Sequence, residues 1–151
     1  LLDEVITESL RHISRKHEDY QIDVECEEFI LVHMDVRLII QVLVNLIDNA
    51  IKYTLPGSKI CIRGIKKDGK AQISVADNGP GISDEVKPHI FEMFYTGNNT
   101  IADSHRSLGL GLALCRSIIE AHGGTLVLTD NIPRGCIFTF TLPLSEVILN
   151  E

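Results

Sequence analysis

Apolar residues recur at helical spacing in three stretches of the chain, which cover residues 2–17, 36–53 and 109–122. Spacings of three and four residues place such side chains along one side of a helix, where they can pack into a core. The pattern therefore predicts three main helices. The second, VRLIIQVLVNLIDNAIKY, is the longest, so we expect the rest of the chain to be organised around it.

Alternating apolar and polar residues predict strands between these helices. The expected strands cover residues 21–26, 29–33, 59–66, 71–77, 125–129 and 136–142. The Asp68-Gly69 pair predicts a tight hairpin between the third and the fourth of them. Because helices and strands do not alternate regularly, we expect an α/β fold of the α+β kind. It is a two-layer sandwich with about three main helices on one face of a mixed, roughly five-stranded sheet, in a single domain of residues 1–151.

Polar and glycine residues mark the ends of these elements. Asp35 is expected to cap the N-terminus of the second helix, and Gly123-Gly124 to close the third. A short helix is expected to open at Ser83. Residues 95–107 are polar, aperiodic and rich in glycine and asparagine, which predicts a loop long enough to be functional.

The second helix also carries a polar stripe, whose members lie three or four residues apart and therefore share one face. The stripe consists of Gln41, Asn45, Asp48, Asn49 and Lys52. A solvated helix face would explain it, but such faces favour Glu, Lys and Arg, whereas this one holds neutral amides. Amide oxygens suit Mg²⁺ and a lysine suits a phosphate, so the stripe is also a candidate binding site.

A carboxylate continues the apolar face of the fourth predicted strand. Ile73, Val75 and Asp77 share that face by the period of two, and an inward carboxylate needs a partner. The turn Asn78-Gly79-Pro80-Gly81-Ile82 follows directly. It is either a simple tight turn or a place where a ligand approaches the backbone.

A glycine pair, Gly109 and Gly111, opens the third helix. Glycines at a helix N-terminus let backbone amides approach an anion, although they also permit close packing. A nucleotide would satisfy all of these features together. The inward carboxylate can accept from an adenine amino group, and the amides with Lys52 can hold phosphates and Mg²⁺.

Composition narrows the range of partners. The 151 residues carry a formal net charge of −7, and the pI is about 5.3. Because the sequence has no run of basic residues, we do not expect it to bind nucleic acid or an anionic membrane surface. No apolar stretch reaches the roughly 18 residues of a membrane span. The four cysteines lack CxxC spacing, and the six histidines are scattered, so no zinc site or disulfide framework is indicated.

Four segments, taken in order, resemble a known family. NLIDNAIKYT (45–54), DNGPGI (77–82), IFEMFY (90–95) and LGLGLALC (108–115) are similar to the N, G1, F and G2 boxes of sensor histidine kinases, within the GHKL ATP-binding superfamily. The resemblance implies the Bergerat sandwich. The tracts SLGLGLALCRSIIEAHGG and NIPRGCIFTFTLP look most like potassium-responsive Kdp-type sensor kinases.

The resemblance also implies roles for individual residues. Asn49 looks like the Mg²⁺ ligand, Asn45 and Lys52 like catalytic neighbours of the phosphates, and Tyr53 like the ring over adenine. Asp77 looks like the adenine-reading carboxylate, and residues 95–107 like the ATP lid. The ATP-binding set that the resemblance implies is Asn45, Asn49, Lys52, Tyr53, Asp77, Gly79, Gly81, Ile82, Arg106, Leu108, Gly109, Leu110, Gly111 and Leu112.

Three positions depart from the family pattern. Ser107 stands where a further glycine is common, and Thr96 stands where a basic residue is common, a charge that Arg106 is placed to supply instead. Cys136 replaces the serine or threonine that often follows the glycine of the last strand.

The family includes kinases and ATP hydrolases, and one position separates them. Hydrolases resemble one another in placing a glutamate one turn before the Mg²⁺ asparagine. Asn45 stands there, and an amide cannot act as a base toward water. The implied activity is therefore that of a protein-histidine kinase, with a nucleotide-binding regulatory module and an anti-sigma-type serine kinase as alternatives.

The implied partners follow from what a kinase of this type needs. The accepting histidine is expected on dimerisation helices upstream of Leu1, because no histidine here has the sequence context of a phosphoacceptor. A response regulator is expected downstream in the pathway of the parent protein. We expect the isolated domain to be a monomer and the cytosolic part of a membrane-anchored sensor.

Overall fold

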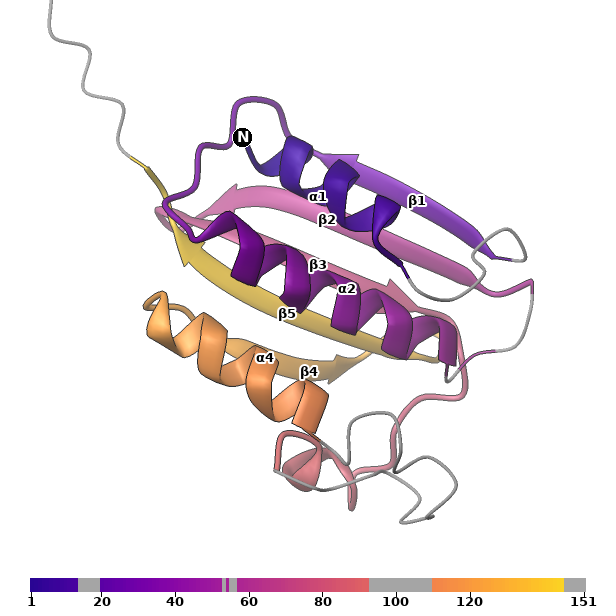
Figure 1. Cartoon of the computed structure of the whole chain (residues 1–151). Coiled ribbons are helices and arrows are strands. Elements are labelled where there is room, and N and C mark those ends of the chain that lie inside the picture. The colour runs from indigo at the N-terminus through magenta and orange to yellow at the C-terminus, as the bar shows by residue number, and fades with distance from the viewer. Residues whose placement is uncertain (14–19, 53, 55–56, 93–109, 146–151) are drawn as a thin grey trace, which may run out of the picture.

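The computed structural model describes residues 1–13, 20–52, 54, 57–92 and 110–145 (Figure 1). Its helices are α1 (Leu2–Arg11), α2 (Val36–Lys52) and α4 (Leu110–Ala121), with a short 3₁₀ turn η1 (Lys87–His89). Its strands are β1 (Gln21–Cys26), β2 (Lys59–Lys67), β3 (Lys70–Asp77), β4 (Leu126–Asp130) and β5 (Cys136–Pro143). In this part of the chain, no helix has the length and apolar character that crossing a membrane requires.

The five strands form one mixed sheet in the order β1-β2-β3-β5-β4. β1 runs parallel to β2, and every other neighbouring pair is antiparallel. The three helices lie together on one face of this sheet (Figure 1). The structure thus confirms the two-layer sandwich that the hydrophobic pattern predicts.

The core lies between the helices and this face of the sheet. α2 buries seven side chains along its length, which makes it the central helix. β3 alternates buried and half-buried positions, and Ala71, Ile73, Val75 and Asp77 are its buried set. The carboxylate of Asp77 therefore does continue an apolar face, as the period of two predicts.

The expected helix ends and the hairpin are confirmed. The backbone N–H of Leu38 donates to Asp35 Oδ1 at 3.3 Å, so Asp35 caps α2. Asp68 and Gly69 both have positive φ, as a two-residue hairpin turn requires. At the end of α4, Gly123 has φ +83°, and the backbone N–H of Gly124 donates to the Ile119 carbonyl. These two features are those of a helix C-terminus capped by glycine.

Three predicted elements are wrong in extent. Residues 29–33 form no strand, because Phe29 has φ +59° and breaks the extended chain, and Val32 makes only an isolated bridge with Leu144. The helix expected from Ser83 is reduced to η1, where Pro88 removes one backbone donor. The first helix was expected to reach residue 17, but α1 ends at Arg11. Residues 14–17 of the expected helix lie outside the described part of the chain.

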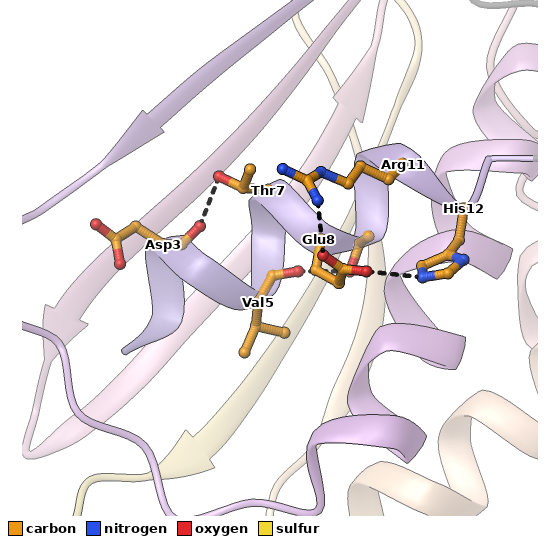
Figure 2. A network of polar contacts seen from close by, with 7 residues as sticks. Asp3, Val5, Thr7, Glu8, Arg11 and His12 are labelled. Carbon is orange, nitrogen blue, oxygen red and sulfur yellow. Dashed lines mark hydrogen bonds and ion pairs between the residues drawn. The ribbon is translucent and has the colours of Figure 1, made fainter.

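Side chains gather where α1 ends. Glu8 pairs with Arg11 at 3.6 Å and with His12 at 3.0 Å, and these contacts turn both side chains back along the helix (Figure 2). The hydroxyl of Thr7 donates to the Asp3 carbonyl, and the buried Ser9 hydroxyl donates to the Val5 carbonyl.

Candidate functional site

α2 and α4 pack antiparallel, and specific contacts fix their registry. The backbone N–H of Asp35, at the start of α2, donates to His122 Nε2 at 3.0 Å, just past the end of α4. Further along, the Cys115 thiol donates to the Val42 carbonyl at 3.9 Å, and the Asn45 side chain lies close to the same sulfur. Continuing this registry by one turn brings Gly111 beside the turn of α2 that holds Asn49.

The polar stripe of α2 is largely sheltered from solvent. Only Gln41 is exposed, whereas Asn45, Asp48, Asn49 and Lys52 are all half-buried. A simple solvated face would leave all of these side chains exposed. The stripe is therefore half-buried for most of its length and is not a simple solvated helix face.

The C-terminal end of α2 is held by residues that the sequence patterns did not single out. The buried Thr54 hydroxyl donates to the Ala50 carbonyl at 2.7 Å. Tyr20 reaches over from the start of β1, and its hydroxyl donates to the carbonyls of Ile51 and Thr54 at 3.2 and 3.4 Å. Together these bonds satisfy carbonyls in the last turn of α2 and just after it.

Asp77 ends β3 with its side chain 8% exposed. Its Oδ1 accepts from the backbone N–H of Gly79 at 2.9 Å and from that of Cys136 at 3.3 Å. Burial raises the pKa of Asp77 above its ordinary value, although both N–H bonds oppose the shift. Both bonds engage the same oxygen, which fixes the direction in which the carboxylate points.

The turn between β4 and β5 wraps around Asp77. The side-chain amide of Asn131 donates to the Asp77 carbonyl at 2.8 Å. Gly135 lies so close that a Cβ on it would come 1.9 Å from the same carbonyl oxygen. Only glycine fits there, and sequence reasoning identified neither residue as a neighbour of Asp77.

The glycine loop after Asp77 also packs on this turn. Gly79 is buried, and Gly81 has φ +84° and faces the backbone of Gly135. Burial, and after it the carboxylates of Asp77 and Asp130, raises the pKa of Cys136 to about 11, so a protonated thiol stands where the family often has a hydroxyl.

These parts converge at one end of the molecule. Figure 1 shows the C-terminal ends of α2 and β3 and the N-terminal end of α4 at the same end of the sandwich. Gly111 and Leu112 are half-buried in the first turn of α4, and Leu110 begins that helix. The elements that carry the described members of the predicted site therefore end on the same side of the molecule, and the site itself stays a prediction.

Comparison with known proteins decides the family. The model of the family described as histidine kinase-, DNA gyrase B-, and HSP90-like ATPase matches residues 34–146. The chain belongs to this family. It is 41% identical over 144 residues to the sensor protein KdpD of Clostridium acetobutylicum, a match that covers 95% of this chain and 16% of that protein.

Solved histidine kinases share the fold. The mycobacterial sensor histidine kinase MprB matches with a TM-score of 0.83 at 27% identity, over 97% of both chains. The catalytic domain of histidine kinase ThkA matches with a TM-score of 0.81 at 35% identity, over 94% of this chain and 93% of that one. ThkA in complex with the response regulator TrrA matches with a TM-score of 0.78 at 34% identity, over 95% of this chain and 40% of that one. Within its family, the chain is the ATP-binding catalytic domain of a histidine kinase.

Several predicted site residues lie outside the described part of this kinase domain. They are Tyr53, Arg106, Leu108 and Gly109, together with the expected lid at residues 95–107. Of Leu110 only the backbone is described. Their assignments stay predictions.

The donor set on α2 fits Mg²⁺. This ion is usually held by one or two protein oxygens, with phosphate oxygens and waters completing the octahedron. Asn49 offers a half-buried amide oxygen of that kind, one turn from Asn45. In the described residues no three His, Cys, Asp or Glu side chains gather in a way that would hold a metal by themselves.

A groove lies on the other face of the sheet, and two residues of its lining, Asn78 and Asn131, also belong to the surroundings of Asp77. Its charged lining comes from cross-strand pairs, Lys59 with Asp23 at 3.5 Å and Arg63 with Glu25 at 2.9 Å. These side chains alternate with the core positions of β2, so they point away from the helices. The kinase site lies on the helix-covered side.

Proposed function

We propose that this domain binds Mg-ATP and donates the γ-phosphoryl group to a histidine on a separate dimerisation domain of a two-component sensor kinase. Asp77 is the observation that carries the proposal. A carboxylate buried at the end of β3, with one oxygen held by two backbone N–H groups, is costly unless a ligand uses the remaining acceptor capacity. The exocyclic amino group of adenine is such a ligand.

The phosphates would lie along the polar stripe, between α2 and the first turn of α4. In this proposal Asn49 holds Mg²⁺, and Asn45 and Lys52 contact the phosphates. Gly111 and the N-terminus of α4 would present backbone amides to the phosphate oxygens. Phosphoryl transfer requires mainly positioning and charge neutralisation, which such a set can supply.

Asn45 favours transfer to an external nucleophile over hydrolysis. Its side chain lies close to the Cys115 thiol, one turn of α2 before Asn49. An amide at this position has no proton-accepting power near neutral pH, so water is not activated there. The histidine of the dimerisation domain is then the better acceptor.

The wider context of the parent protein is proposed from its relatives. The 41% identity with KdpD supports a potassium-responsive sensor, and the ThkA–TrrA complex supports a response regulator as the next partner. The domain would act on the cytosolic side of such a sensor. If it replaced the corresponding domain of a KdpD protein, the chimaera should retain potassium-dependent signalling.

Transfer in trans tests the proposal. The domain is mixed with a separately supplied dimerisation domain and labelled ATP, and label is expected on the acceptor histidine only when Mg²⁺ is present. Asn49→Ala should abolish transfer and most of the Mg²⁺ dependence of nucleotide binding, while Asn45→Ala should keep more of that dependence. Gln41→Ala, at the exposed end of the same stripe, is the matched control and should behave as the wild type.

The other outcomes are informative. Nucleotide binding without transfer to any acceptor would identify a regulatory module, and label on a serine would identify an anti-sigma-type kinase. If Asn45→Ala alone removed the Mg²⁺ dependence and Asn49→Ala left transfer intact, the roles of the two asparagines would be reversed.

A further inference from the structure

Lys87, the first residue of η1, lies between two carboxylates. Its Nζ is 2.6 Å from Asp84 Oδ1 and 2.7 Å from Asp130 Oδ1. The lysine side chain is 21% exposed, whereas those of Asp84 and Asp130 are 93% and 63% exposed. Most lysines on a protein surface extend into solvent, so a sheltered lysine with two short contacts is a fixed structural connection.

One of these contacts joins segments that are far apart in the sequence. Asp130 ends β4, and Lys87 lies ten residues beyond Asp77 along the chain. Asn131, the residue after Asp130, donates to the Asp77 carbonyl. The same turn therefore holds both ends of the segment that begins at Asp77 and ends at Lys87.

This segment contains the DNGPGI loop. At its start, Asn78 Oδ1 accepts from the backbone N–H of Lys59, and Gly81 packs on the backbone of Gly135. Toward its end, Asp84 forms an ion pair with Lys87, three residues further along the chain. The backbone N–H groups of Val86 and Lys87 both donate to the Ser83 carbonyl. The ion pair with Asp130 then connects the end of this segment to the end of β4.

We propose that Lys87 is a positioning residue for adenine recognition, because its bridge to Asp84 and Asp130 holds the loop at residues 78–86 against the β4–β5 turn. The proposal rests on the proposed function, in which Asp77 and this loop contact the base. Lys87 itself touches neither the base nor the phosphates. Its loss should therefore weaken base recognition and leave phosphoryl transfer from bound ATP intact.

Substitutions at both ends of the bridge test this role. Lys87→Met keeps the aliphatic length and removes the charge, and Asp130→Asn removes the partner charge. Each should raise the dissociation constant for Mg-ATP about twofold to fivefold, the range expected for an ion pair near the surface. The double variant should bind as weakly as either single variant, and Lys87→Arg should restore most of the affinity.

A kinetic readout separates positioning from simple stabilisation. In transfer to the dimerisation domain, Lys87→Met should raise KM for ATP and leave kcat unchanged. Affinity for inorganic triphosphate with Mg²⁺ should stay constant, because the phosphates bind along α2 and α4. Lys70→Met is the matched control, since Lys70 starts β3 at the opposite end of the strand from Asp77.

The possible results are distinct. Unchanged ATP affinity in Lys87→Met would overturn the proposal, as would an equal loss for ATP and triphosphate or a failure of Lys87→Arg to restore binding. Absence of ATP binding by the wild type would overturn the proposed function itself. Weaker binding of ATP alone, with an unchanged kcat, would support the role of Lys87.

Discussion

In the proposed site, Asp77 serves adenine recognition at a cost to folding. Its carboxylate is buried, and burial raises its pKa, so the folded chain holds a proton at this site more readily than the unfolded chain does. By linkage, this group makes the folded state more stable as the pH falls through its raised pKa and less stable above it. Adenine recognition needs the ionised form, because only that form is purely an acceptor.

Asp77→Asn should separate these two effects. The amide oxygen can still accept from the N–H groups of Gly79 and Cys136, while the burial of a charge is removed. We expect the variant to be at least as stable as the wild type at neutral pH in urea titrations, with the difference vanishing at acid pH. The new NH₂ group would face the adenine amino group, and ATP binding should weaken by about 2–5 kcal/mol in calorimetry.

Unchanged ATP affinity in Asp77→Asn would make Asp77 a structural turn residue only. The wild-type domain offers a second check, because protonation of Asp77 should remove its acceptor role. ATP affinity should therefore fall as the pH falls through the raised pKa of this carboxylate, and the Asn variant should lack that part of the pH dependence.

Residue patterns in the sequence identified Asp77 but not the residues that hold it. The period of two along β3 was enough to predict an inward carboxylate. Asn131 contacts Asp77 across 54 positions, and a turn with asparagine and glycine is common without any such contact. Contacts of this kind depend on which strands become neighbours, and β3 and β5 become neighbours only in the folded sheet.

At the level of elements, the β4–β5 turn is a close-fitting support for the end of β3. Gly135 has φ +115° and backs directly onto the Asp77 carbonyl. The turn between β2 and β3 also contains a glycine of positive φ, Gly69 with φ +78°, but a Cβ there would meet no atom within 4 Å. The two glycines therefore differ in surroundings while sharing a conformation that favours glycine.

Gly135→Ala and Gly69→Ala form a matched pair. Gly69→Ala should cost about 1–3 kcal/mol of unfolding free energy from backbone strain alone. Gly135→Ala should cost more, since the methyl group would displace the Asp77 carbonyl, and it should also weaken ATP binding. Urea unfolding and calorimetry on both variants would check this, and equal losses in the pair would contradict the fit described for Gly135.

Helices and strands were predicted correctly where the sequence pattern of neighbouring residues was strong. α2 and the β2–β3 hairpin were predicted because apolar periodicity and an Asp-Gly turn act over neighbouring residues. Residues 29–33 have the composition of a strand, yet Ile30 is buried against the core and Phe29, 74% exposed, takes a left-handed conformation. Tertiary packing of one residue outweighed strand propensity there.

At the scale of the whole molecule, the sandwich would join two halves of the proposed kinase site that come from distant parts of the chain. In that proposal, the base-recognising half is at the ends of β3 and β4 and the start of β5, and the phosphate half is on α2 and α4. His122 and Cys115 lock α4 to α2, and Phe91 links the base side to α4 through Arg116, whose guanidinium lies 5.3 Å from its ring centroid. A ligand that contacts both halves should therefore stabilise the fold as a unit.

Thermal unfolding with and without metal tests this whole-molecule coupling. A ligand at 100 times its dissociation constant adds about 2.7 kcal/mol to the unfolding free energy, which raises the Tm by several degrees in a domain of this size. ATP with Mg²⁺ should give such a rise, and EDTA should remove most of it, because the phosphates then lack the cation that neutralises them. In Asn49→Ala the rise with Mg²⁺ should shrink to the EDTA level, whereas in Asp77→Asn the rise should be smaller but still depend on Mg²⁺. If EDTA left the wild-type rise intact, the metal would have no part in binding, and the assignment of Asn49 would be wrong.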